Sequence, residues 1–204
     1  ILETTSANVE YSASITSNSR LISAGWYHAC GLSEQGEAIC WGRDNFGQVS
    51  GAGQASFIEI GSGAFHNCGI TKNGNTKCWG WSDLQQLSTP TTSFTQLAVG
   101  SYHNCGLNTA GGIECWGDNR SGQANPPDDA GYIAIAAGRQ NTCALKYNGK
   151  AVCWGINNFG QSTPPKERRW TQISLGAFHG CGLTVLGNIE CWGYSGFQPK
   201  GAPT

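Results

Sequence analysis

The chain has 204 residues, of which 12% are charged, and 12 Lys and Arg residues nearly balance 13 Asp and Glu residues for a formal net charge of −1. This balance argues against a nucleic-acid binder, which normally needs a basic surface. The 8 Trp, 7 Phe and 6 Tyr residues argue against a disordered chain. No stretch reaches the roughly 18 apolar residues of a membrane-spanning helix. We therefore expect a globular protein without membrane insertion.

The first predicted element is a strand over residues 8–16, where apolar and polar residues alternate. Five repeats follow, with first cysteines at 30, 68, 105, 143 and 181, so that the steps are 38, 37, 38 and 38 residues. Each repeat has Gly five residues before this cysteine, Leu or Ile two residues after it, and Trp-Gly directly after a second cysteine. Gly-Gln follows in repeats one, three and four, and Gln85-Gln86 replaces it in repeat two. A fixed period of this length predicts a repeat architecture.

The ten cysteines form five pairs, each with a spacing of ten residues. The pairs are Cys30 and Cys40, Cys68 and Cys78, Cys105 and Cys115, Cys143 and Cys153, and Cys181 and Cys191. Zinc sites more often place cysteines about two to four residues apart, whereas this regular long spacing in a Met-free chain predicts structural disulfides. We therefore expect a secreted, extracellular protein. Asn119 begins a glycosylation sequon, usable only in a eukaryotic secretory pathway.

The third repeat shows how each unit converts into strands. Residues 94–99, 102–107 and 113–116 are β-prone, and the glycines at 111 and 112 favour a tight turn between the last two. The two cysteines then lie opposite each other across an antiparallel hairpin, where a disulfide can form. Alternation places the residue two before the first cysteine, the cysteine and the later Leu or Ile on one face, where a neighbouring sheet should pack.

Stacked sheets with this period predict an all-β protein, a β-propeller of five blades with three to four antiparallel strands each. The alternatives are a solenoid and a dimer of open arcs. We expect one domain over residues 1–204, with residues 1–20 pairing with the last blade to close the ring. The repeats span approximately residues 21–56, 57–93, 94–131, 132–169 and 170–204.

The repeat pattern is clearest at Ala98-Val99-Gly100-Ser101-Tyr102-His103-Asn104-Cys105-Gly106-Leu107, followed by Cys115-Trp116-Gly117 and Gly122-Gln123. It resembles the repeats of the regulator of chromosome condensation family over about residues 21–198. The resemblance implies a propeller, usually of seven blades, and the paired cysteines look most like the extracellular branch, which includes a secreted β-lactamase inhibitor and Crinkly-type receptor ectodomains. The chain departs from the family in having only five repeats and a disulfide in each. The exchange-factor and chromatin roles of the founding nuclear member are not expected, because the compartment differs and a basic tail is missing.

Histidines occupy one slot of the repeat, namely His28, His66, His103 and His179, with Asn141 in repeat four. One interpretation is a ring of metal ligands. We prefer buried histidines that hydrogen-bond to the backbone, because symmetry-related blades rarely bring nitrogens to one point. We expect no metal and no cofactor, and interpret the repeated Trp as packing residues.

Catalysis has little support in the sequence, and we predict that the protein is not an enzyme. Nucleophile and metalloprotease motifs are missing, and every cysteine is assigned to a disulfide. The alternative is an enzyme in which Asp44 and Asp118 act as an acid–base pair, but the distance between them does not follow from the sequence.

Residues that break the repeat are the candidate ligand-binding residues. The loop after each Cys-Trp-Gly contributes Arg43, Asp44, Trp81, Asp83, Asp118, Asn157, Asn158 and Tyr194. Trp26 and Arg139 form a second set, just before the second strand of their repeats. Aromatic planes beside Asp and Asn suit sugar rings. The alternative for each single residue is ordinary surface variation.

These features favour a secreted, non-catalytic recognition module, and we predict a carbohydrate-binding propeller lectin, because repeated shallow sites gain avidity. The alternative is a protein-binding module, such as an enzyme inhibitor or receptor-type ectodomain; a structural matrix component is the third option. A lectin should repeat its site residues in several blades, whereas a protein binder needs one asymmetric patch. The loop residues are not repeated, which leans toward the protein binder on this test. The expected partner is a glycan or an extracellular protein, and the expected state is a monomer or small homo-oligomer.

Overall fold

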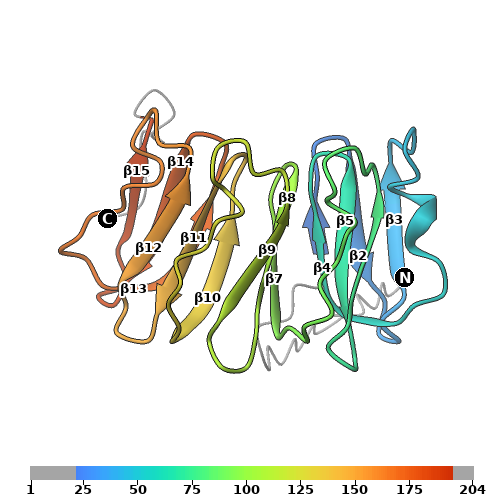
Figure 1. Ribbon diagram of the computed structural model, residues 1–204, viewed down its shortest axis with the longest axis horizontal. Coiled ribbons are helices and arrows are strands. Elements are labelled where there is room, and N and C mark those ends of the chain that lie inside the picture. Colours follow the sequence, from blue (N-terminus) through green and yellow to red (C-terminus); the bar gives the residue numbers. More distant parts are fainter. Residues whose placement is uncertain (1–21, 195–204) are drawn as a thin grey trace, which may run out of the picture.

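The structure, a computed structural model, describes residues 22–194, which form five three-stranded antiparallel sheets, one for each repeat (Figure 1). We number these sheets blades 1–5. They contain β1 (Ile22–Ala24), β2 (His28–Leu32) and β3 (Ala38–Gly42); β4 (Phe57–Ser62), β5 (His66–Thr71) and β6 (Thr76–Gly80); β7 (Gln96–Val99), β8 (His103–Leu107) and β9 (Ile113–Gly117); β10 (Tyr132–Ala137), β11 (Asn141–Lys146) and β12 (Ala151–Gly155); and β13 (Trp170–Leu175), β14 (His179–Thr184) and β15 (Ile189–Gly193). A short 3-10 helix, η1 (Ser50–Ala52), follows blade 1.

All five predicted disulfides are formed, each between the second and third strand of its blade. The antiparallel register explains them, because the two cysteines of a repeat are directly opposite each other. In blade 3, Cys105 pairs with Cys115 across β8 and β9, with their Cα atoms 4.0 Å apart. The predicted all-β fold with stapled blades is confirmed.

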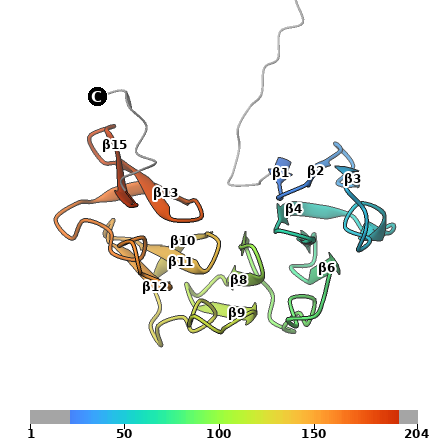
Figure 2. The same cartoon turned by 90° about the horizontal axis from the view of Figure 1, so that it is seen from above.

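The blades stand side by side in an open arc (Figure 2). The first strands, such as β4 and β10, line the inside of the arc, and the third strands, such as β6 and β9, lie on the outside. Blade 1 is the first blade among the described residues, and its repeated Trp, Trp41, is 49% exposed. In blade 2 the equivalent Trp79 is 4% exposed, because the loop of the preceding blade covers it. The strand predicted to close the ring lies within residues 1–20, outside the described residues. Within residues 22–194, no helix is long and apolar enough to cross a bilayer.

The hydrophobic core is divided among the four junctions between successive blades. At the junction of blades 2 and 3, Cys68 and Ile70 of β5 pack on Phe94, Leu97 and Trp116. The cysteine and the residue two positions later therefore share the face that covers the next blade, as the alternation predicts. Equivalent clusters fill the other three junctions.

A hydrogen-bond network, which we call the inter-blade network, accounts for the repeated Trp and Gln. Gln86 is fully buried, and its side-chain oxygen accepts from the Leu84 backbone N–H at 2.9 Å, which folds the loop back on itself. Its main-chain carbonyl then accepts from Trp116 Nε1 of the next blade at 3.1 Å. Gln48, Gln123 and Gln161 hold Trp79, Trp154 and Trp192 in the same way, at 2.9–3.1 Å.

The histidine slot belongs to the same network. His66 Nε2 lies 2.8 Å from the Asn104 side-chain oxygen of the next blade, and Asn104 Nδ2 donates to the Gln86 carbonyl at 2.9 Å. His28 and Asn67 repeat this pair, and Thr142 replaces the amide opposite His103. His28, His66 and His103 are buried as predicted, but their partners are side chains of the next blade rather than backbone groups, and His179 in blade 5 is only half-buried. Burial lowers the pKa of His66 to about 4 and that of His103 to about 3.

Candidate functional site: an aromatic face

Two loops of every blade meet at the same end of the strands. In blade 3, the Asp118 N–H that follows Trp116-Gly117 donates to the carbonyl of Tyr102 at 2.9 Å, and the other blades repeat this bond. Gly117 permits the approach: its φ is +95°, and a Cβ there would lie 2.7 Å from the Tyr102 carbonyl oxygen. The loop after Cys-Trp-Gly and the loop before the second strand therefore form one surface.

Aromatic side chains cover this surface on blades 1–3. The members in mutual ring contact, at centroid distances of 5.5–6.5 Å, are Trp26, Tyr27, Phe46, Phe65, Trp81 and Tyr102. Trp26 of blade 1 contacts both Phe65 of blade 2 and Tyr102 of blade 3. The cluster is open to solvent, because Tyr27 is 56% exposed and Trp26 is 45% exposed.

Arg139 of blade 4 extends the cluster toward blade 5. Its guanidinium carbon lies 5.7 Å from the ring centroid of Trp26 and 5.7 Å from that of Phe178, within the range of a cation–π contact. Phe178 in turn contacts Phe159, which contacts Tyr194. We call the rings of both clusters, together with Arg139, the aromatic face. Contiguous exposed apolar patches mark interaction sites in many globular proteins.

A hollow of about 200 Å³ opens beside Trp26 and Arg139 at the inner edge of the arc. The inner-strand ends of every blade line it, including Gly25, Gly63 and Gly100. Ala64, Ser101 and Ala177 occupy the positions equivalent to Trp26 and Arg139 in the other blades. These two large side chains therefore break the repeat at the one place where all blades converge.

The structure brings five of the sequence-predicted candidates together on this face: Trp26, Arg43, Trp81, Arg139 and Tyr194. Arg43 lies 5.6 Å from the ring centroid of Tyr27.

Two other candidates, Asp44 and Asn157, are used inside their own loops. The Asp44 carboxylate accepts from the backbone N–H groups of Val49 and Ser50 at 2.7 and 3.1 Å, and the first of these bonds is the main reason that its pKa is lowered. The side-chain oxygen of Asn157 accepts from the Ser162 N–H at 2.9 Å. These groups shape the loops.

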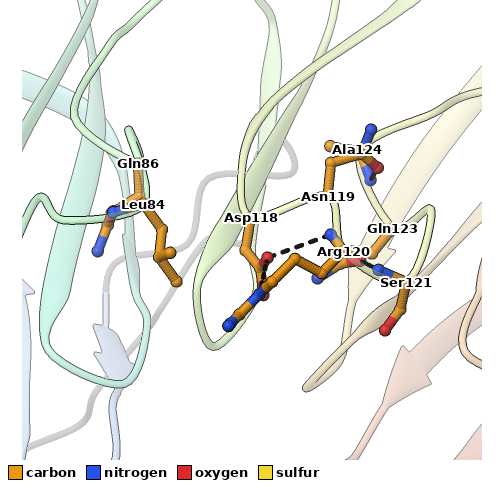
Figure 3. A network of polar contacts seen from close by, with 8 residues as sticks. All are labelled: Leu84, Gln86, Asp118, Asn119, Arg120, Ser121, Gln123 and Ala124. Carbon is orange, nitrogen blue, oxygen red and sulfur yellow. Dashed lines mark hydrogen bonds and ion pairs between the residues drawn. The ribbon is translucent and has the colours of Figure 1, made fainter.

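The Asp118 side chain also has a partner within its own loop: it is 3% exposed and forms an ion pair with the exposed Arg120 (Figure 3). Arg120 Nε and Nη2 donate to the two carboxylate oxygens at 2.7 and 3.0 Å, and this contact holds the pKa of Asp118 below its usual value. Asp44 and Asp118 lie in blades 1 and 3 with both carboxylates engaged in their own loops, which gives no support to the alternative of an acid–base pair.

The remaining candidates, Asp83 and Asn158, are exposed at the loop tips. Asn119 is exposed as well, and its Nδ2 donates to the side-chain oxygen of Asn125 at 2.7 Å, so its glycosylation stays a prediction. In the described part of the chain, no three His, Cys, Asp or Glu side chains are grouped to hold a metal ion.

Sequence reasoning missed most of the aromatic face. Tyr27, Phe65, Tyr102 and Phe178 precede the histidine slot in four of the five repeats. This recurrence was a usable signal, because an aromatic residue directly before the second strand in four repeats places rings at the same end of four blades. Phe46 and Phe159 carried a weaker signal, two residues before the buried Gln of their loops.

The family model of the regulator of chromosome condensation (RCC1) repeat matches the sequence at residues 20–48, 57–86, 94–123 and 132–161, which is more than half of the chain. The chain belongs to the RCC1 repeat family. None of the curated proteins matches the chain significantly.

Solved structures with the same fold include two plant receptor ectodomains. The ectodomain of the Physcomitrella patens receptor kinase CR4 is 28% identical, with a TM-score of 0.72, and the match covers 84% of this chain and 49% of that one. The CRINKLY WD40 ectodomain of the Arabidopsis thaliana receptor kinase ACR4 is 27% identical, with a TM-score of 0.72 and coverages of 89% and 65%.

Yeast RCC1 (Prp20), solved with Kap60 bound, is 18% identical, with a TM-score of 0.74 and coverages of 88% and 58%, and supports the fold alone. The chain spans about half to two thirds of the length of these solved chains.

Proposed function

We propose that this RCC1-type chain is an extracellular, non-catalytic protein-binding module whose aromatic face is the binding surface. The observation that carries the proposal is the continuous set of exposed and half-buried rings on blades 1–3, joined to the rings of blades 4 and 5 by Arg139. The five disulfides and the likeness to two receptor ectodomains support an extracellular setting.

The composition of the face suits a protein partner. Trp, Tyr and Arg are the residues that most often carry the energy of protein–protein interfaces, because they bury large areas and still form polar contacts. The rings contact one another, so little side-chain freedom would be lost on binding. Arg43 and Arg139 place positive charge at two points of an otherwise apolar surface.

Asymmetry favours a protein over a glycan. A lectin that gains avidity from its repeats needs similar groups in several blades, but the residue directly after Trp-Gly differs in every blade: Arg43, Trp81, Asp118, Ile156 and Tyr194. The polar candidates Asp44, Asp118 and Asn157, which would contact sugar hydroxyls, bond to their own loops. Both facts weigh toward the alternative that the sequence offered.

The test presents the oxidised chain to two probes in parallel, a phage-displayed random peptide library and a glycan array. We expect the library to yield peptides whose binding is reduced at least 10-fold by Tyr102→Ala or Trp81→Ala, since central interface aromatics typically contribute about 2 kcal/mol or more. The matched control is Tyr147→Ala, since Tyr147 is 88% exposed in the turn at the opposite end of blade 4.

Selective sugar binding that Trp81→Ala or Tyr194→Ala weakens would overturn the proposal in favour of a lectin. Peptides that bind Tyr102→Ala and Trp81→Ala as tightly as the wild type would show that the binding surface lies elsewhere.

A further inference from the structure

The arginines of residues 22–194 have different partners: Arg43 contacts the ring of Tyr27 and forms no ion pair, whereas Arg139 alone contacts two rings. Arg120 and Arg168 each contact a carboxylate, of Asp118 and Glu190 respectively, at 2.7 Å. Among residues 22–194, no carboxylate lies within ion-pair distance of Arg139. Its guanidinium is instead held between the rings of Trp26 and Phe178.

The ring contacts fix the Arg139 guanidinium in a position from which it can bind an anion. The two ring contacts come from blades 1 and 5, so three blades fix the position of one guanidinium. Arg139 is half-buried, and neither ring contact uses its N–H groups as hydrogen-bond donors to a carboxylate. The planar fork of a guanidinium matches the two oxygens of a carboxylate. Side-chain freedom that Arg usually loses on binding is already restricted.

We propose that Arg139 is the specificity-determining anchor of the aromatic face and binds an Asp or Glu side chain of the partner protein. This inference rests on the proposed function, because it names the partner chemistry of the same surface. The partner segment carries its acidic residue between apolar residues, since rings lie on both sides of Arg139: Trp26 and Tyr102 toward blade 3, and Phe178 and Phe159 toward blade 5.

The geometry favours an internal side chain over the carboxyl end of a chain. A terminal carboxylate on Arg139 would leave one of the two ring clusters uncovered, whereas a segment that crosses the arc covers both. Apolar contacts on each side would also exclude water from the ion pair and strengthen it.

The experiment uses peptides selected on the oxidised wild-type chain from a library in which the random segment lies between fixed linkers. We expect enrichment of Asp or Glu with apolar neighbours. With synthetic, end-capped peptides, Arg139→Gln should weaken binding about 10- to 100-fold, as for loss of hydrogen bonds to a charged group. Replacing the peptide's Glu by Gln should cost the same, and combining both changes should add little.

Two further chain variants separate charge from fold. Arg139→Lys keeps the charge but loses the planar fork, so we expect an intermediate affinity. Arg168→Gln is the matched control, an exposed arginine paired with Glu190, and should bind as the wild type does. Circular dichroism and thermal melts of Arg139→Gln establish that the blades are intact.

Wild-type affinity for Arg139→Gln, or no loss with the Gln peptide, would overturn the anchor. If Arg139→Gln bound normally but Tyr102→Ala still abolished binding, the proposed function would stand without the Arg139 anchor. If neither Arg139→Gln nor Tyr102→Ala reduced binding, the anchor and the proposed function would both fail. Recovery of binding by a free carboxyl terminus on the Gln peptide would overturn the assignment to an internal side chain.

Discussion

The inter-blade network predicts that one buried amide couples blades 2 and 3. Asn104 is fully buried; its oxygen accepts from His66 Nε2 at 2.8 Å, and its nitrogen donates to the Gln86 carbonyl at 2.9 Å. The substitution Asn104→Leu keeps a similar volume and removes both bonds. The Gln86 carbonyl retains Trp116 Nε1, but the His66 N–H is left without an acceptor.

A buried donor that loses its partner costs about 1–3 kcal/mol, and a lost neutral hydrogen bond at a satisfied carbonyl costs less. We therefore expect Asn104→Leu to lower the free energy of unfolding by about 2–3 kcal/mol. Because repeat proteins unfold by interfaces between neighbouring units, we also expect the melt to broaden as blades 1–2 separate from blades 3–5.

The assay is guanidinium unfolding of the oxidised chain at neutral pH, followed by Trp fluorescence. Asn158→Leu is the matched control on an exposed loop and should change stability by less than about 0.5 kcal/mol. The double variant His66→Leu/Asn104→Leu should be more stable than Asn104→Leu alone, because it removes the unpaired donor. A single variant as stable as the control, or a double variant with additive losses, would refute the reasoning.

The free energy of unfolding should fall by several kcal/mol in total as the pH drops from about 6.5 toward 4. The reason is that the unfolded chain protonates His66 and His103 near pH 6.5, whereas their folded pKa values are about 4 and 3. Urea melts at several pH values measure this dependence, and a free energy that does not change with pH would contradict the prediction. Replacing Cys105 and Cys115 by Ala should cost about 3 kcal/mol, since their disulfide closes a loop with a sequence separation of 10, and an unchanged thermal melt would count against that account. Gly117→Ala should destabilise the chain by more than Gly122→Ala, because both have positive φ but only Gly117 has backbone atoms within 3 Å of the added Cβ; equal losses in denaturant melts would exclude the steric argument.

The sequence alone determined the blades, because their signals are local. A spacing of ten residues, a turn glycine and period-two alternation decide which cysteines face each other and which residues enter the core, and Cys105, Cys115 and Leu107 lie where these rules place them. The slot histidines were predicted to be buried for the same reason. Their bonds to Asn67, Asn104 and Thr142 were not foreseen, because each crosses to the next blade.

The candidate site depended on tertiary structure. Asp44, Asn157 and Asp118 are polar loop residues in the sequence, but the path of each loop turns them toward their own backbone or Arg120. Trp26 and Arg139 are separated by more than two repeats and touch only because the arc curves their strands toward a common centre. Local spacing fixes what a single blade looks like, whereas contact between distant blades depends on the angle at every junction, and that angle is set by side-chain packing between sheets rather than by any one repeat.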